Sequence, residues 1–355
     1  MLMRIALAIF IAVELLNGAS RASAQSALLN LPLASQQASL TQTIGITNIT
    51  IDYHRPLVSG RKIFDGLVPY GKVWRAGANL NTTIAFSDPV TIEGHALSKG
   101  VYGLHLIPGA TTWVVIFSKN STAWGSFSYD QAEDALRVTV KPVIIDHQEA
   151  LSYSFDDLNP ASAVITMRWE RVAVPFKVEV DTTQIVEQSL GNQLRGRVQF
   201  EWQAWEEAAE YLLNNNLNPG EALKYADSSI ENEDRFENEI TKSRALNSVG
   251  RKDDAAEVRT RALAMGSQQQ VYQYARGWQR QGHSNEALEI FRSNVSKDPN
   301  SWIAHAQKMR IAVAQHDFDT ALEQIKLAIQ IAPESVKSQL ADLETQLENK
   351  VDINQ

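Results

Sequence analysis

The chain has 355 residues, a formal net charge of −8 at pH 7 and no cysteine. The lack of cysteine excludes disulfides, thiolate metal ligands and a cysteine nucleophile. The acidic charge argues against nonspecific nucleic-acid binding, which needs a basic face, and the length is enough for two domains with separate cores.

The first 24 residues have the pattern of a secretory signal peptide. Arg4 gives a basic start, "IALAIFIAV" is a short apolar run, and "ASA" at positions 22–24 has the small residues of a cleavage site. We therefore expect a signal peptide over 1–24, and an exported protein that is periplasmic or extracellular. No later apolar run reaches about 20 residues, so the mature chain is predicted to have no membrane span.

From residue 25 to residue 185 the pattern favours an all-β domain. Apolar and polar residues alternate in short runs separated by turn signals, with no helical period between them. Many short strands in succession are typical of an antiparallel sandwich, here expected to be jelly-roll-like, or a barrel. The predicted strands are 47–53, 82–87, 101–107, 112–118, 136–142, 150–155, 163–169 and, less regularly, 175–180.

The segment 53–79 lies between two of these strands and is long for a loop, which is typical of a functional segment or a packed insert. It has five basic residues and one acid, Asp65. Guanidinium groups pair with carboxylates or phosphates, and an indole ring stacks on a sugar. The candidate residues for a small anion or glycan ligand are Arg55, Arg61, Trp74, Arg75 and Asn79. The alternative is structural: Trp74 fills one end of the sandwich, and the arginines bond loop carbonyls and Asp65.

Metal binding and catalysis have weaker signals in this domain. His54 and His105 are possible metal ligands only if separate strands bring them together, because no H-x-H or H-E-x-x-H pattern is present. No G-x-S-x-G elbow, Walker loop or dinucleotide loop occurs either, and no cofactor is predicted. An enzyme would need an acid or base near the loop, such as His54, His105 or a carboxylate.

The segments "YHRP…GRKIFDGLVPYGKVWRAGAN…TTIAF", "LSKGVYGLHLIPG…WVVIFSK…WG…Y" and "LRVTVKP" follow one another in a fixed order. Over about 40–180 this pattern resembles the secreted bacterial family catalogued as domain of unknown function 2911. Similar proteins carry a tetratricopeptide-like helical tail, and the resemblance implies no activity. His54 stands where the pattern has Ser, and Leu80 where an acidic residue often follows.

From residue 186 to residue 355 the chain repeats itself. Segments that begin at 221, 254, 286 and 320 share a central alanine, namely Ala222, Ala255, Ala287 and Ala321, at spacings of 33, 32 and 34 residues. This is the tetratricopeptide period, and it predicts about four units of two antiparallel helices, closed by a last helix over 333–350. Trp202, Trp205, Trp278 and Trp302 fall on the first helices of units, where we expect them in the core.

Such arrays bind partner proteins along a concave face, although this one could also be a structural tail or a dimerisation surface. The sequence therefore predicts an exported, non-catalytic protein whose β domain binds a small polar ligand and whose repeats bind a protein. The alternatives are a hydrolase of envelope or extracellular glycans, and a purely structural scaffold.

Overall fold

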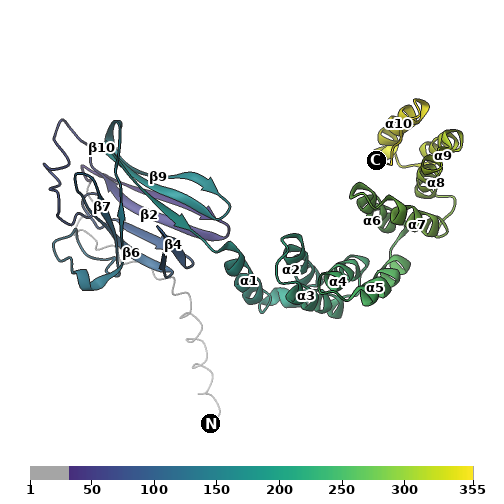
Figure 1. Ribbon diagram of the computed structural model, residues 1–355, viewed down its shortest axis with the longest axis horizontal. Helices are drawn as coiled ribbons and strands as arrows, with labels where there is room; N and C mark the ends of the chain where they lie inside the picture. Colours follow the sequence, from purple (N-terminus) through teal and green to yellow (C-terminus); the bar gives the residue numbers. More distant parts are fainter. Residues whose placement is uncertain (1–31, 355) are drawn as a thin grey trace, which may run out of the picture. The chain divides into compact units, whose positions relative to one another are not determined.

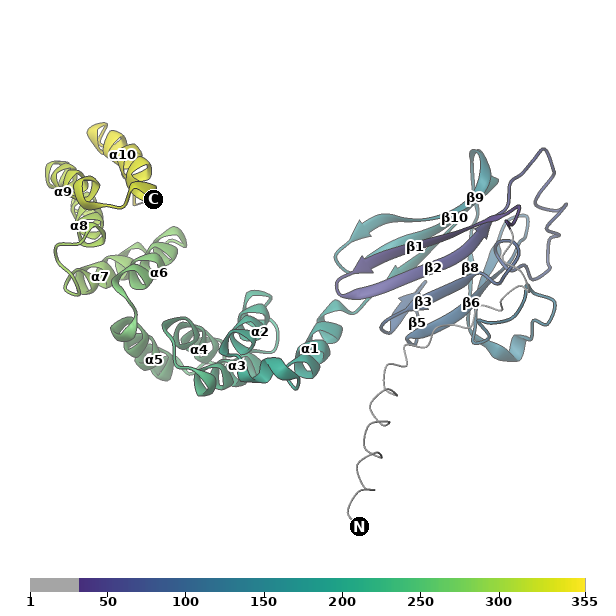
Figure 2. The same cartoon turned by 180° about the vertical axis from the view of Figure 1, so that it is seen from behind.

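A computed structural model of the protein describes residues 32–354, so the predicted signal peptide over 1–24 lies outside the described residues. The described chain forms two compact units, one up to Ser189 and one from Leu190 onward. The first unit consists mainly of strands and the second of helices (Figures 1 and 2). The predicted fold class, an all-β domain followed by helical repeats, is confirmed.

The strands of the first unit form two antiparallel sheets that share one core. The larger sheet has the order β1-β2-β3-β6-β7-β8 and the smaller has the order β5-β4-β10-β9. The strands are β1 (Gln36–Ile44), β2 (Thr47–Arg55), β3 (Thr83–Phe86), β4 (Val90–Ile92), β5 (His95–Leu97), β6 (Gly100–Ile107), β7 (Trp113–Ser118), β8 (Asp134–Val140), β9 (Val143–Asn159) and β10 (Ser162–Glu179).

Buried and more exposed side chains alternate along the strands, and this alternation places one side of each sheet in the core. On β2 the buried side carries Ile49, Ile51 and Tyr53, and on β10 it carries Met167 and Trp169, all at most 5% exposed. Side chains two residues apart share a face, so these strands bury one apolar row each. This is the interior of a two-sheet sandwich.

The strands β1, β4 and β5 were not predicted, and two of the predicted strands form a single strand in the structure. The runs 163–169 and 175–180 both belong to β10, which continues through register shifts. β1 is an edge strand whose outward side is polar, and β4 and β5 have three residues each. Such short or polar strands carry too few apolar positions for a period to be recognised.

The second unit consists of helix pairs followed by a last helix (Figure 1). The division between the units falls within α1 (Thr182–Gln193), a helix that was not predicted. The pairs are α2 (Trp202–Asn214) with α3 (Pro219–Asn232), α4 (Phe236–Ser248) with α5 (Lys252–Met265), α6 (Gln268–Arg280) with α7 (Ser284–Val295), and α8 (Trp302–Ala314) with α9 (Phe318–Ile331), and α10 (Glu334–Glu348) packs on α9.

The repeated alanines lie on the second helix of each pair and are at most 1% exposed. A methyl group at this position lets the second helix approach the first closely. Trp205, Trp278 and Trp302 are partly buried against the clusters between helices, as expected, whereas Trp202 is partly buried outside these clusters, with Arg235 over its ring. Within residues 32–354, no helix combines the length and the apolar character needed to cross a lipid bilayer.

Candidate functional site

Trp74 and Arg75 are neighbours in the chain but project to opposite sides of the larger sheet. The backbone N–H of Trp74 donates to the carbonyl of Leu106, and that of Leu106 donates back, both at 2.8 Å. Residue 74 therefore behaves as a strand position facing the core. Its ring stacks on Trp169 with centroids 5.7 Å apart, and its indole N–H donates to the carbonyl of Gly77. The predicted ligand residue Trp74 is thus packed on the core, as the structural alternative describes.

Three other predicted ligand residues hold the backbone of their own domain. Arg55 Nε donates to the carbonyl of Leu151 at 2.9 Å. Arg61 donates from Nε to the carbonyl of Val58 and from Nη2 to that of Leu57. Asn79 has a positive φ of 55°, and its amide donates to the carbonyl of Ser35. Each of these side chains therefore bonds a backbone carbonyl of its own domain and helps to fix the loop, as the structural alternative describes.

Arg75 differs from the other arginines of the segment. It is partly buried, its Nε is fully buried without a hydrogen-bond partner, and no carboxylate among residues 32–354 pairs with it. Burial lowers the pKa of its guanidinium. A partly desolvated cation without an acceptor is unfavourable, because a buried charge needs a partner to replace water.

The neighbour of Arg75 is another polar side chain without a partner. His54 is 4% exposed and its Nδ1 has no hydrogen-bond partner in the described chain. Burial, and then the charge of Arg75, lower the pKa of His54 below its usual value. The imidazole therefore stays neutral at pH 7 and does not add a second positive charge beside the guanidinium.

These two residues belong to the outer face of the larger sheet, opposite the sandwich core. On β2, His54 lies two residues after Asp52 and therefore on the same face of the sheet. The row of paired residues that includes Asp52 continues across the sheet through Thr83, Gly103 and Ser118. Ile51 and Ile84 form the neighbouring row and face the core, so the row that includes Asp52 faces away from the core.

Two loops cover this outer face, which explains why it is buried. A Cβ on Gly77 would lie 2.6 Å from Thr82 Oγ1 and 3.2 Å from the carbonyl of His54. A Cβ on Gly103 would lie 2.5 Å from the carbonyl of Asn120. The loops 75–82 and 119–133 therefore lie directly on the sheet. We call His54, Arg75 and His105, together with the residues of loop 119–133 beside them, the outer-face cluster.

At the other end of the outer-face cluster most polar groups have partners within the chain, although Asp134 Oδ1 is buried without one among the described residues. His105 is 2% exposed, its Nδ1 lies 3.0 Å from Ser126 Oγ, and burial lowers its pKa to about 4 although Asp134 opposes this. Tyr129 donates to Asp134 Oδ2 at 2.6 Å, and Arg137 donates to both. Among residues 32–354 no three His, Asp or Glu side chains converge as a metal site, so His54 and His105 are not brought into one.

Two exposed aromatic rings lie beside Arg75. Trp124 and Phe127 are 56% and 80% exposed and stack with centroids 5.6 Å apart. A Cβ on Gly125, which lies between them in sequence, would be 2.8 Å from Arg75 Nη1 and 3.2 Å from the Phe127 ring. An unpaired cation and an open aromatic face therefore meet at Gly125. The sequence analysis missed this loop, although two aromatic residues around a glycine were a usable signal.

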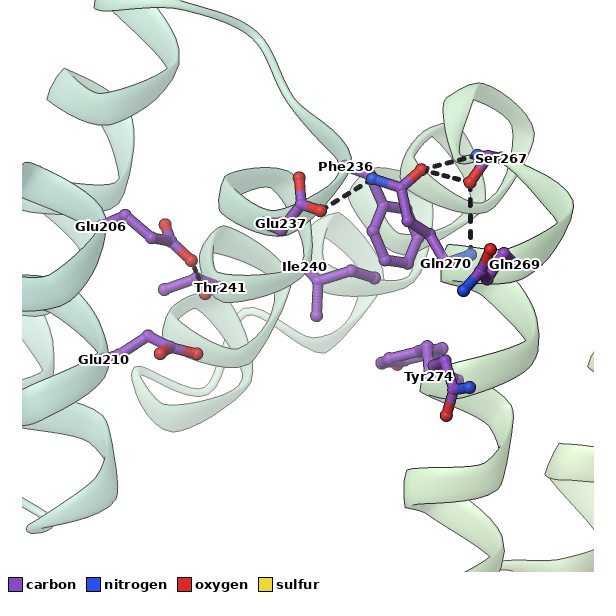
Figure 3. A pocket seen from close by; sticks show the side chains of 11 residues that line it. Glu206, Glu210, Phe236, Glu237, Ile240, Thr241, Ser267, Gln269, Gln270 and Tyr274 are labelled. Atoms are coloured by element: carbon purple, nitrogen blue, oxygen red, sulfur yellow. Dashed lines mark hydrogen bonds between the residues drawn. The ribbon is translucent and has the colours of Figure 1, made fainter. Parts of the chain in front are cut away.

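A separate groove lies in the helical unit. Its volume is about 500 Å³, and it is lined by the first helices of three successive pairs, α2, α4 and α6 (Figure 3). The lining side chains are Glu206 and Glu210 from α2, Phe236, Glu237, Ile240 and Thr241 from α4, and Ser267, Gln269, Gln270, Gln273 and Tyr274 at the start of α6. We call this the repeat groove.

Glu206 is the most unusual residue of the repeat groove. It is 9% exposed; Oε1 accepts a hydrogen bond from Thr241 Oγ1 at 2.7 Å, and Oε2 is buried without a partner among the described residues. Burial, assisted by the charges of Glu210 and Glu237, raises its pKa to about 7. The sequence analysis did not single out Glu206, because a glutamate on an amphipathic helix is normally a surface residue.

The β domain of this chain matches a known protein family. Residues 35–178 match the model of a family described as a protein of unknown function, DUF2911, which confirms the resemblance expected from the sequence. A solved structure, YrrB, described as a tetratricopeptide-repeat protein with an unusual peptide-binding site, is similar at 17% identity, over 45% of this chain and 84% of that chain, with a TM-score of 0.27. No curated protein matches the chain.

The opposite placement of Trp74 and Arg75 gives a paired prediction. Trp74→Ala removes a ring from the core and is expected to lower the free energy of unfolding by about 3 kcal/mol or more. Arg75→Met keeps the aliphatic stem but removes an uncompensated charge, so it is expected to change stability by less than about 1 kcal/mol. Chemical denaturation of the full chain measures both. Equal large losses would show that Arg75 is a structural residue.

Proposed function

We propose that this chain is an exported, non-catalytic binding protein whose helical repeats take up a segment of a partner protein in the repeat groove. The observation that carries the proposal is that one open hollow runs across three successive first helices, α2, α4 and α6. Stacked two-helix units present such a continuous surface to extended chains. Export rests on the predicted leader and is part of the proposal.

The lining of the repeat groove supports a peptide rather than a compact apolar ligand. Gln269 and Gln273 present amide groups, which donate and accept hydrogen bonds as a peptide backbone does, whereas the amide of Gln270 is already bonded to Ser267 and Glu237. Phe236 and Tyr274 lie edge to face with centroids 6.1 Å apart and give the same groove an aromatic wall. Polar groups along an apolar wall fix the path of an extended segment and bury some of its side chains.

The test is site-specific photo-crosslinking in the envelope fraction of producing cells. A benzophenone amino acid at Gln273 is expected to capture a discrete partner, and the same probe at Glu257, an exposed residue on the second helix α5, is not. The captured segment, made as a synthetic peptide, should bind the purified chain and lose about tenfold or more in affinity on Tyr274→Ala. Identical capture at both positions would contradict the proposal.

A second binding function is supported by the outer-face cluster. Arg75 offers an unpaired guanidinium, and Trp124 and Phe127 offer exposed rings next to it. A guanidinium binds a carboxylate through a two-point fork, and an aromatic face packs on the apolar face of a sugar ring. We therefore assign an acidic sugar as the small ligand of the β domain. Of the five ligand residues predicted from sequence, this proposal uses Arg75.

Calorimetry of the full chain with oligogalacturonate and with its neutral counterpart, a galactose oligomer, tests this assignment. The acidic oligomer is expected to bind at least tenfold more tightly, and Arg75→Gln or Phe127→Ala should each remove most of that affinity. Arg171→Gln, at an exposed arginine of the same domain, is the charge-matched control. Equal binding of both oligomers, or unchanged binding by Arg75→Gln, would refute it. The glycan hydrolase and the structural scaffold stay as hypotheses.

A further inference from the structure

The repeat groove has a strong charge bias. Three glutamates line it, and no lysine, arginine or histidine is among the described residues that do so. Two of the three carboxylates already have partners: Glu210 pairs with Arg244 at 3.3 Å, and Glu237 accepts from Gln270 at 2.7 Å. Glu206 accepts from Thr241 but pairs with no cation, and of the three carboxylates it alone has an oxygen, Oε2, that is buried without a partner in the described chain.

The apolar residues of the groove lead toward that carboxylate. Figure 3 shows Glu206 with Thr241 on one side of the groove, Ile240 and Phe236 beyond them, and Tyr274 on the opposite wall. Lysine and arginine have this combined character, since an aliphatic stem packs on apolar surface while the charged head reaches a polar group.

We propose that the repeat groove recognises a lysine or arginine side chain of the partner segment, whose stem packs on Ile240 and Phe236 and whose charged head pairs with Glu206. This inference rests on the proposed function, that the groove takes up a protein segment, and it names the chemistry of that segment. Charge complementarity commits the groove to a basic occupant, because an acidic side chain would repel Glu206 and a neutral one would leave its buried charge uncompensated.

The pairing couples binding to a proton. In the free protein the pKa of Glu206 is about 7, raised by burial and by Glu210 and Glu237, and lowered by Thr241 and Arg244. A bound cation favours the ionised carboxylate, so near neutral pH the binding step releases a proton to solvent. Below about pH 7 that proton must be removed first, and affinity falls. Above pH 8 the carboxylate is already ionised, and affinity levels off.

The experiment selects binders from a phage-displayed library of random peptides on the immobilised full chain at about pH 8. The wild type is expected to enrich peptides with lysine or arginine at one fixed position. Glu206→Gln should lose this preference. Glu207→Gln removes an exposed carboxylate from the next position of the same helix and is the matched control, which should keep the preference.

A selected peptide is then measured by calorimetry against its norleucine replacement and against spermidine. Between pH 8 and pH 6 the affinity of the wild type for the basic peptide is expected to fall about tenfold, while Glu206→Gln shows no such change. The peptide with norleucine in place of its basic residue should bind at least tenfold more weakly than the basic peptide at pH 8.

The outcomes separate this inference from the proposed function. Groove binders without any basic residue would overturn the inference and leave peptide binding intact. A library that yields no binder sensitive to Tyr274→Ala would overturn the proposed function itself. Spermidine that binds as tightly as the peptide, with the same pH dependence, would show that the groove takes a free polycation and not a protein segment.

Discussion

A charge removed from water without a partner destabilises a fold, and each unit of this chain holds one such group at its candidate site. In the β domain it is the guanidinium of Arg75, and in the helical unit it is the carboxylate of Glu206. The two groups have opposite charge, and their surroundings push them the same way, toward the neutral form: burial lowers the pKa of Arg75 and raises that of Glu206. A ligand of opposite charge relieves this cost, which gives both sites a physical reason to bind.

The same chain provides partners for buried charges elsewhere. Arg310 is 3% exposed, and it donates to the carbonyl of Ile353 at 2.9 Å near the end of the chain. Glu239 is fully buried and pairs with Arg261. Asp134 accepts from both Tyr129 and Arg137. These charges therefore have an opposite charge or a carbonyl beside them, although one oxygen of Glu239 and one of Asp134 are buried without a donor among the described residues. Within the described chain Arg75 and Glu206 have no counter-ion, and they stand beside an exposed aromatic pair and inside an open groove.

The sequence predicts the architecture better than the sites, for a physical reason. The alanine spacing and the strand alternation are local periods, and they located the helix pairs and most strands. Whether Arg75 is free and Arg61 is bonded depends on loop geometry, and the inward direction of Trp74 depends on its pairing with Leu106. The repeat groove joins residues of α2, α4 and α6 that are more than 25 residues apart in sequence from one helix to the next, so no local pattern marks it.

The central claim is that Glu206 is held without a counter-ion until a cation binds, and the pH dependence of stability tests it most directly. The free energy of unfolding of wild type and Glu206→Gln is measured from pH 4 to pH 9 through the helical circular dichroism signal. Because the folded pKa of about 7 exceeds the ordinary value of 4.5, the folded state holds the extra proton, and wild-type stability is lost as pH rises from about 4.5 to 7. Glu206→Gln should avoid this loss and be more stable by about 3 kcal/mol at pH 8, with the difference vanishing at pH 4. A variant that is less stable than wild type at every pH would contradict the account.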